Sequence, residues 1–186
     1  MTILPRHPRV RASPRHRALT VMEMLVVTTV IGIVAVTAIP AVSAARDAYR
    51  VGAAAELERH LLTARAEALA TGRPRGVRVD RVTTRIEHLV IASAGATPTP
   101  ATDALGSPRG GVLLADSMRG VAITAMTDGA GAASSLMTVW FANDGTPQRR
   151  GADGSLQGPA AAQASVEFPG NHGVRVTPVS GAVERW

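Results

Sequence analysis

Apolar residues form one unbroken stretch early in the chain. Residues 19–45 contain a single formal charge, Glu23. A helix rises about 1.5 Å per residue, so these 27 residues are long enough to cross the roughly 30 Å hydrocarbon core of a bilayer. The stretch therefore predicts a membrane-spanning helix.

The pattern then becomes periodic, with apolar positions three and four residues apart, as in an amphipathic helix. The residues on this face are Ala54, Leu57, Leu61, Ala64 and Ala68. A glycine and a proline at positions 72 and 74 follow in the order expected at a helix end. The two segments together predict one helix of about 50 residues, with a kink where Pro40 interrupts its hydrogen bonds.

From residue 76 onward the period is two, which predicts short β-strands. The expected strands are 77–82, 85–92, 111–115, 120–125, 136–142, 164–168 and 173–179. Segments 92–111 and 146–163 are poor in core residues and are expected to be exposed loops. The predicted fold class is α+β, with a long N-terminal helix packed on an antiparallel β-rich domain.

The charge of the chain is unevenly distributed. Five of its 20 basic residues, all arginine, precede residue 19, and no acid does; the rest of the chain carries 15 arginines against 14 acids. The formal charge of +6 is therefore a property of residues 1–18, which read as a basic leader. This distribution does not favour nucleic acid as a partner, because residues 19–186, with 15 arginines against 14 acids, carry a net charge of only +1 for phosphates.

A basic flank before a membrane helix predicts that the N-terminus stays in the cytoplasm and that the C-terminal part is exported. A secretory signal peptide cleaved near residues 41–45 is the alternative reading of the same stretch. Two features oppose that reading: signal sequences have apolar regions of about 7–15 residues, and the helical pattern here continues past residue 45.

The segment 17–25, Arg-Ala-Leu-Thr-Val-Met-Glu-Met-Leu, resembles the class III leader junction of type IV pilins and type II secretion pseudopilins. The resemblance implies that prepilin peptidase cuts between Ala18 and Leu19 and methylates the new amine of Leu19. Glu23 then takes the fifth position of the mature chain. In this family that carboxylate takes part in subunit assembly, and a proline at the place of Pro40 commonly kinks the helix.

The implied organisation is a leader at 1–18, a transmembrane helix at 19–45, its amphipathic continuation at 46–72 and a periplasmic β-rich domain at 73–186. The resemblance places the chain in the cell inner membrane as a single-pass protein. Its implied partners are other major and minor pseudopilins, prepilin peptidase and the inner-membrane assembly platform.

Segments 61–68, 139–145 and 174–176 resemble the minor pseudopilin H of the type II secretion system and the related pilus-assembly protein T family. The first relation implies a structural subunit of the pseudopilus that drives protein export across the outer membrane. The second implies a minor pilin in type IV pilus assembly or DNA uptake. For that alternative, the candidate DNA contacts are Arg149, Arg150 and Arg175.

Catalytic residues are sparse in this sequence. The chain has no cysteine, which removes disulfide scaffolds, thiolate metal sites and thiol nucleophiles. His60, His88 and His172 fall on a predicted helix, strand and turn without a metal-ligand or triad spacing. We therefore predict no enzymatic activity, no cofactor and no metal.

Overall fold

The computed structural model describes residues 20–93, 96–102, 106–118 and 120–186. The leader 1–18 and both residues of the expected cut, Ala18 and Leu19, lie outside the described residues. The chain divides into two compact units, Met1–Val42 and Ser43–Trp186.

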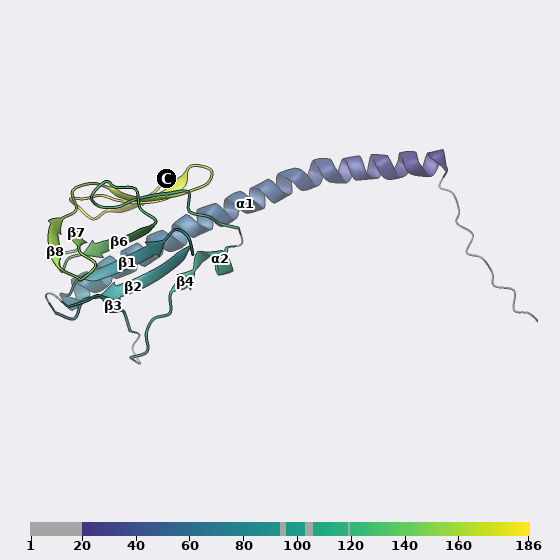
Figure 1. Cartoon of the computed structure of the whole chain (residues 1–186). Coiled ribbons are helices and arrows are strands. Elements are labelled where there is room, and N and C mark those ends of the chain that lie inside the picture. Colours follow the sequence, from purple (N-terminus) through teal and green to yellow (C-terminus); the bar gives the residue numbers. More distant parts are fainter. Residues whose placement is uncertain (1–19, 94–95, 103–105, 119) are drawn as a thin grey trace, which may run out of the picture. The chain divides into compact units, whose positions relative to one another are not determined.

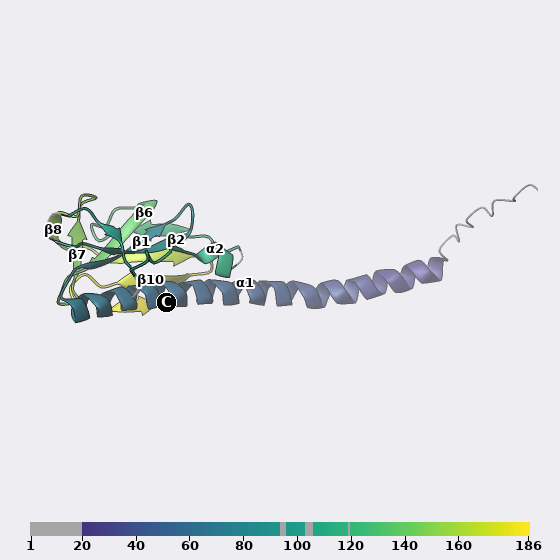
Figure 2. The ribbon, with the colours of Figure 1, turned by 90° about the horizontal axis from the view of Figure 1, so that it is seen from below.

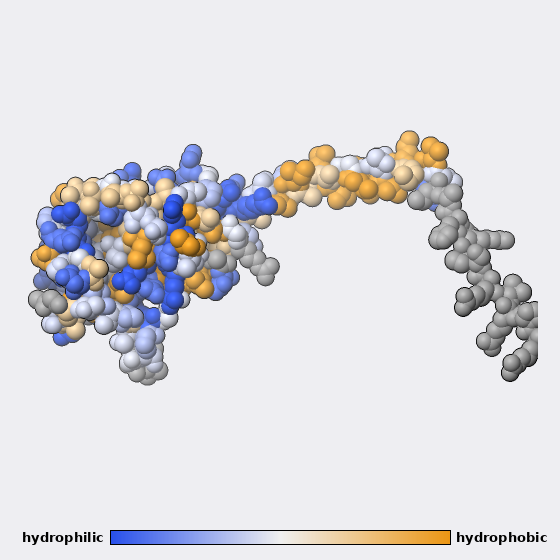
Figure 3. Space-filling view, viewed as in Figure 1, coloured by the Kyte–Doolittle hydropathy of each residue, from blue (hydrophilic) through white to orange (hydrophobic). Residues whose placement is uncertain are grey.

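One helix, α1, runs from Val21 to Thr71 over 51 residues and is the longest element in Figure 1. All described residues of the first unit, 20–42, are exposed, and their apolar side chains colour that part of α1 orange in Figure 3. Its threonines bond to the helix backbone: Thr28 Oγ1 donates to the Met24 carbonyl at 2.6 Å and Thr29 Oγ1 to the Leu25 carbonyl at 2.8 Å. By length and composition α1 is able to cross a membrane.

The second unit contains two antiparallel sheets. The larger has the strand order β3 (Thr99–Pro100), β2 (Arg85–Val90), β1 (Arg75–Asp80), β6 (Leu136–Phe141), β7 (Pro147–Arg150), β8 (Leu156–Pro159), with β4 (Val112–Leu113) also pairing β2. The smaller has the order β11 (Val183–Arg185), β10 (His172–Val176), β9 (Ala164–Phe168), β5 (Ala125–Thr127). A short helix, α2 (Leu114–Ser117), follows β4.

The main core lies between the second part of α1 and both sheets, which Figure 2 shows along that part of the helix. The predicted helix face, Ala54, Leu57, Leu61, Ala64 and Ala68, is buried throughout. Alternate residues of β1 and β6 and residues of β9 and β10 complete this core; they include Val77, Val79, Met137, Val139, Phe141, Val166 and Val174. The predicted α+β fold class is confirmed.

The predicted end of α1 also agrees with the structure. α1 ends at Thr71, and Gly72 has φ +61°, a left-handed conformation that glycine adopts readily and that closes many helices. Strands predicted at 77–82, 85–92, 136–142, 164–168 and 173–179 are present within a few residues.

Four expectations for the β-rich part are wrong. Segment 92–111 is not wholly an exposed loop, since it contains β3 and the buried Ala101. Segment 146–163 is not a loop, since it forms the β7–β8 hairpin, whose register depends on backbone pairing and not on apolar alternation. Of the predicted strand 111–115 only Val112–Leu113 pairs before α2 begins. In segment 120–125, Val121 and Ile123 are buried outside the strands, and β5 begins only at Ala125.

The outer face of the larger sheet has a small apolar cluster of Leu89, Ile91 and Trp140. Gly76 of β1 lies opposite Trp140 of β6. A Cβ added at Gly76 would lie 2.7 Å from Cε3 of the Trp140 ring, closer than van der Waals contact allows. Trp140 is 2% exposed, so the ring has little room to move.

We expect Gly76→Ala to lower the free energy of unfolding by about 1–3 kcal/mol, because overpacking forces the indole ring or the strand to shift. The measurement is guanidinium unfolding of the detergent-solubilised chain, followed by near-ultraviolet circular dichroism. Gly110→Ala is the control, because a Cβ there meets nothing within 4 Å. Equal stability of the two variants would contradict the packing argument.

Candidate functional site

Glu23 and Thr20 form a reciprocal set of hydrogen bonds at the start of α1. Glu23 Oε2 accepts from the Thr20 backbone N–H at 2.9 Å and from Thr20 Oγ1 at 3.2 Å. The Glu23 N–H in turn donates to Thr20 Oγ1 at 3.2 Å. This arrangement is a capping box, which satisfies two backbone donors that a helix start otherwise leaves unpaired.

The cap uses only one oxygen of the carboxylate. Within the described residues, Glu23 Oε1 has no hydrogen-bond donor. The negative charge also lies in the first turn of α1, where the helix dipole favours an anion. Glu23 is thus held in position by its own chain, while its second oxygen remains able to accept from a donor outside these residues.

α1 continues through Pro40. Proline has no backbone N–H, so the helical hydrogen bond from this position to the carbonyl four residues earlier cannot form. The kink expected at Pro40 remains a prediction.

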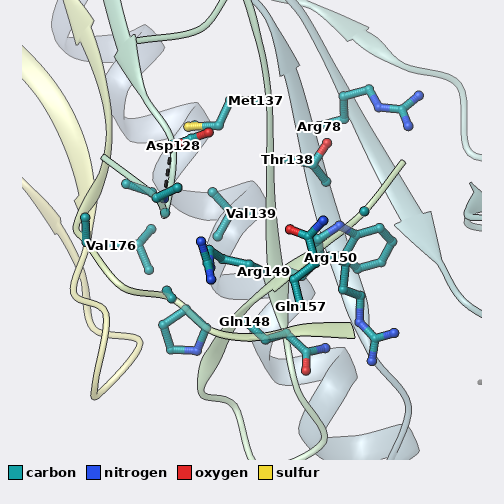
Figure 4. Close-up of a pocket in the computed structure, with 18 of the residues that line it drawn as sticks. Arg78, Asp128, Met137, Thr138, Val139, Gln148, Arg149, Arg150, Gln157 and Val176 are labelled. Atoms are coloured by element: carbon teal, nitrogen blue, oxygen red, sulfur yellow. Dashed lines mark hydrogen bonds between the residues drawn. The ribbon is translucent and has the colours of Figure 1, made fainter. Parts of the chain in front are cut away.

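The three arginines named for DNA contact do not converge. Arg149 and Arg150 are neighbours in β7 and line one cavity of about 290 Å³ in the second unit, shown in Figure 4. Arg175 lies in β10 of the smaller sheet and is absent from the cavity lining. Its guanidinium pairs with Glu184 at 2.9 Å and lies 6.0 Å from the centre of the Trp186 ring.

Acidic side chains pair with many other arginines of the second unit. Glu67 lies within ion-pair distance of Arg75 and Arg109, and Glu87 pairs with Arg78 and Arg85. Further pairs are Arg50–Asp47, Arg59–Glu56 and Arg185–Glu58. Arginines neutralised in this way do not form the continuous basic track that binds a phosphate backbone.

Two histidines that the sequence separates meet in the structure. His60 Nδ1 of α1 lies 2.7 Å from His88 Nε2 of β2. The interpretation of these histidines as scattered is therefore wrong for this pair. The period of each element indicated this contact. His60 falls between the buried Leu57 and Ala64 on the helix, and His88 lies two residues after the buried Ile86, on the same face of the strand.

The surroundings of the pair favour neutral rings. Burial, together with the positive charge that His60 can carry, lowers the pKa of His88 to about 4. Burial also lowers the pKa of His60, against the opposing effect of Glu56. His60 Nε2 lies 3.1 Å from Glu56 Oε1 but has no hydrogen-bond partner, so this contact becomes an ion pair only when His60 is protonated.

The pair does not extend to a metal site. Among the described residues, no three histidine, cysteine, aspartate or glutamate side chains are grouped so that they could hold a metal ion. One imidazole nitrogen donates to the other, so both cannot be protonated without losing this bond. The arrangement therefore suits a structural hydrogen bond between α1 and β2.

Comparison with known proteins gives one structural relation. No protein-family model matches the chain, and no curated protein matches it. The structure is similar to that of the minor pseudopilin EpsH from the type 2 secretion system of Vibrio cholerae, with 16% sequence identity, a TM-score of 0.46, and coverage of 72% of this chain and 92% of that chain. At this level of similarity, function has to be inferred from the chain's own residues.

The histidine pair predicts a loss of stability as the pH falls. The unfolded chain binds a proton at His88 near pH 6.5, whereas the folded chain resists it until about pH 4. Unfolding is therefore favoured progressively between these values, by about 2 kcal/mol for His88 on going from pH 7 to pH 5.

The measurement is the free energy of unfolding at several pH values between 7 and 5, a window above the titration of most carboxylates. We expect His88→Gln, which keeps a hydrogen-bonding group beside His60, to flatten this dependence. His172→Gln, at a histidine outside the pair, should leave it unchanged. A slope in His88→Gln as steep as that of the unmodified chain would refute the assignment; a shallower slope that remains is assigned to His60, whose pKa burial also lowers.

Proposed function

We propose that this chain is a minor pseudopilin of the type II secretion system, a structural subunit of the inner-membrane-anchored pseudopilus that drives protein export across the outer membrane. One observation carries the proposal. Glu23 is the sole formal charge of an exposed apolar helix stretch, and its carboxylate is held at the helix start with one oxygen unused. It stands five residues after the junction that resembles a pilin leader cut.

The chemistry of that position supports assembly. A carboxylate costs on the order of 2.5–3.5 kcal/mol at the centre of a membrane and less near an end, so it usually has a partner. Cleavage before Leu19 would create a cationic amine at the membrane face of each subunit. The amine of one subunit and the Glu23 carboxylate of its neighbour attract strongly where water is excluded, which favours subunit addition.

This function assigns a place to each part of the chain. Residues 19–45 anchor the subunit in the inner membrane with the N-terminus cytoplasmic, and the β-rich domain 73–186 lies in the periplasm. Prepilin peptidase processes the leader, and other pseudopilins and the inner-membrane platform are the assembly partners. Energy for extension comes from outside this chain, so it acts as a moving structural part.

The alternative role, as a minor pilin in pilus assembly or DNA uptake, draws less support from the β-rich domain. Arg175 is occupied by Glu184, and the other arginines of that domain are largely paired with acids. Arg149 and Arg150 face a cavity, not an extended surface on which a DNA strand could lie.

The first test is the N-terminal sequence and mass of the membrane-extracted chain, from native cells with and without prepilin peptidase. We expect the chain to start at methylated Leu19 when the peptidase is present and at Met1 when it is absent. A start near Ala44 would identify a signal peptide instead, and an uncut chain in both strains would also contradict the proposal.

The second test separates the charge of Glu23 from its capping role. Glu23→Gln retains the side-chain oxygen that a capping box needs but lacks the charge. We expect this variant to be processed and inserted, to be absent from the pseudopilus, and to secrete no more than a strain lacking the chain. The readouts are chemical crosslinking to neighbouring pseudopilins and the amount of exported enzyme in the medium.

Thr20→Val is the matched variant, because it removes the hydroxyl of the cap and keeps the carboxylate. It should assemble and secrete. If Thr20→Val fails and Glu23→Gln functions, the helix cap and not the charge is what assembly requires. Normal secretion with pilus loss in a strain without this chain would instead favour the pilus role.

A further inference from the structure

The cavity in the second unit contains an arginine, Arg149, that has no acidic partner among the described residues. Arg149 is partly buried, and its Nε atom is buried without a hydrogen-bond partner. Within the described residues, no carboxylate lies at ion-pair distance from Arg149, in contrast to Arg78, which lines the same cavity and pairs with Glu87 at 3.7 Å. A partly buried guanidinium with a buried, unpaired N–H gains from an anionic partner, so this position can take an anionic ligand.

One carboxylate of the cavity lining is held by its own turn. Asp128 lines the cavity, but its Oδ1 accepts from the backbone N–H groups of Ala130 and Ala132, each at 2.9 Å. These bonds hold the turn at 128–132 closed. Figure 4 shows Arg149 extending toward Val139 and Val176, so its guanidinium lies among apolar side chains.

Arg150 is satisfied by neighbouring groups. Its Nη1 donates to the Gly154 carbonyl at 2.8 Å. With the Gln148 amide oxygen turned toward it, Nε and Nη2 donate to that oxygen at 2.8 and 3.1 Å. Arg149 is therefore the arginine with unpaired N–H donors. Arg150 contributes positive charge, but its N–H groups already donate to neighbouring oxygens.

The charges of the lining match one monovalent anion. The Arg78–Glu87 pair is neutral, and the charges of Arg149 and Arg150 exceed that of Asp128 by one. Val139, Val176 and Met137 supply apolar side chains to the lining, beside the polar side chains of Thr138, Gln148 and Gln157. A carboxylate on an apolar stem suits this lining better than a dianionic phosphate does, because one negative charge balances the surplus of one positive charge. The guanidinium can bind the carboxylate through paired hydrogen bonds.

An unpaired stretch of strand borders the same cavity. β6 and β7 pair only at Trp140–Gln148 and Phe141–Pro147 and then diverge. The Ser135 carbonyl accepts from the Arg81 N–H toward β1, and backbone groups alternate in direction along a strand. The N–H and C=O of Thr138 therefore point to the side where β7 has diverged, where an extended peptide could pair with them.

We propose that this cavity binds an extended peptide segment of another protein, whose aspartate or glutamate carboxylate pairs with Arg149. Backbone pairing beside Thr138 positions the segment, and the apolar lining holds the stem of the acidic side chain. The site lies in the β-rich unit and is separate from Glu23.

The test uses the full chain in detergent micelles and follows the backbone N–H resonance of Thr138 by NMR, which the variants at position 149 retain. The probes are the peptides acetyl-Val-Glu-Val-amide and acetyl-Val-Gln-Val-amide. We expect saturable binding of the glutamate peptide, at least about tenfold weaker binding of the glutamine peptide, and a similar weakening of the glutamate peptide by Arg149→Gln, because a charge-assisted hydrogen bond is lost in each case.

Arg175→Gln is the matched control, an arginine of the other sheet that already has an acid, and it should leave binding unchanged. Arg149→Lys, which keeps the charge but not the planar fork, should retain weaker binding. The comparison of the two peptides on the unmodified chain is independent of how any variant folds.

Equal affinity for the two peptides, or no saturable shift, would overturn the proposal. Tighter binding of butyrate than of the glutamate peptide would overturn the peptide as occupant and identify a free organic acid. Tighter binding of inorganic phosphate or a thymidine oligonucleotide would overturn the carboxylate and identify a nucleic-acid contact.

Discussion

The structure depends on one helix that changes surroundings along its length. The described residues of α1 up to position 42 are exposed and almost wholly apolar, which is stable only when lipid or other helices cover them. From Ala53 onward every third or fourth residue is buried against the sheets. Four of the seven buried positions are alanine, so the sheets approach the helix closely, and Leu57 and Leu61 fill the remaining space.

The polar side chains of α1 also have different partners in its exposed apolar part and in the part that packs on the sheets. In the apolar part, threonine hydroxyls bond to the helix backbone and Glu23 bonds to Thr20, so no described polar side chain there depends on water alone. In the second part, Glu56, Glu58 and Glu67 each have an arginine partner. Two of these partners, Arg185 and Arg109, come from distant parts of the chain, so they bind the helix surface to the β-rich structure around the core.

The features predictable from the sequence are those that a repeating pattern encodes. The helix face from Ala54 to Ala68 and the strands with clear alternation, such as β1 and β6, followed directly from periods of 3.6 and 2. The β7–β8 hairpin did not, because its residues are polar and its pairing is made by the backbone. The His60–His88 contact was not predicted, because it joins two residues that are 28 positions apart in the chain, although each histidine lies on the core-facing side of its element. Spatial separation between elements is equally invisible in the sequence. Arg149, Arg150 and Arg175 were therefore predicted as one group, whereas the fold separates Arg175 from the other two.

Net charge is a poor guide to what the β-rich unit binds. Its arginines and acids are nearly equal in number, but the arginines differ in whether an acid lies beside them. Most have such an acid, and ion pairs of this kind on the surface contribute little to binding or stability. Arg149 differs because no acid lies at ion-pair distance from it among the described residues, and it lies where β6 and β7 diverge. The same divergence leaves backbone groups of Thr138 without a strand partner. An unpaired charge and an unpaired strand edge thus lie in the same place, and this coincidence distinguishes a binding site from an isolated surface arginine.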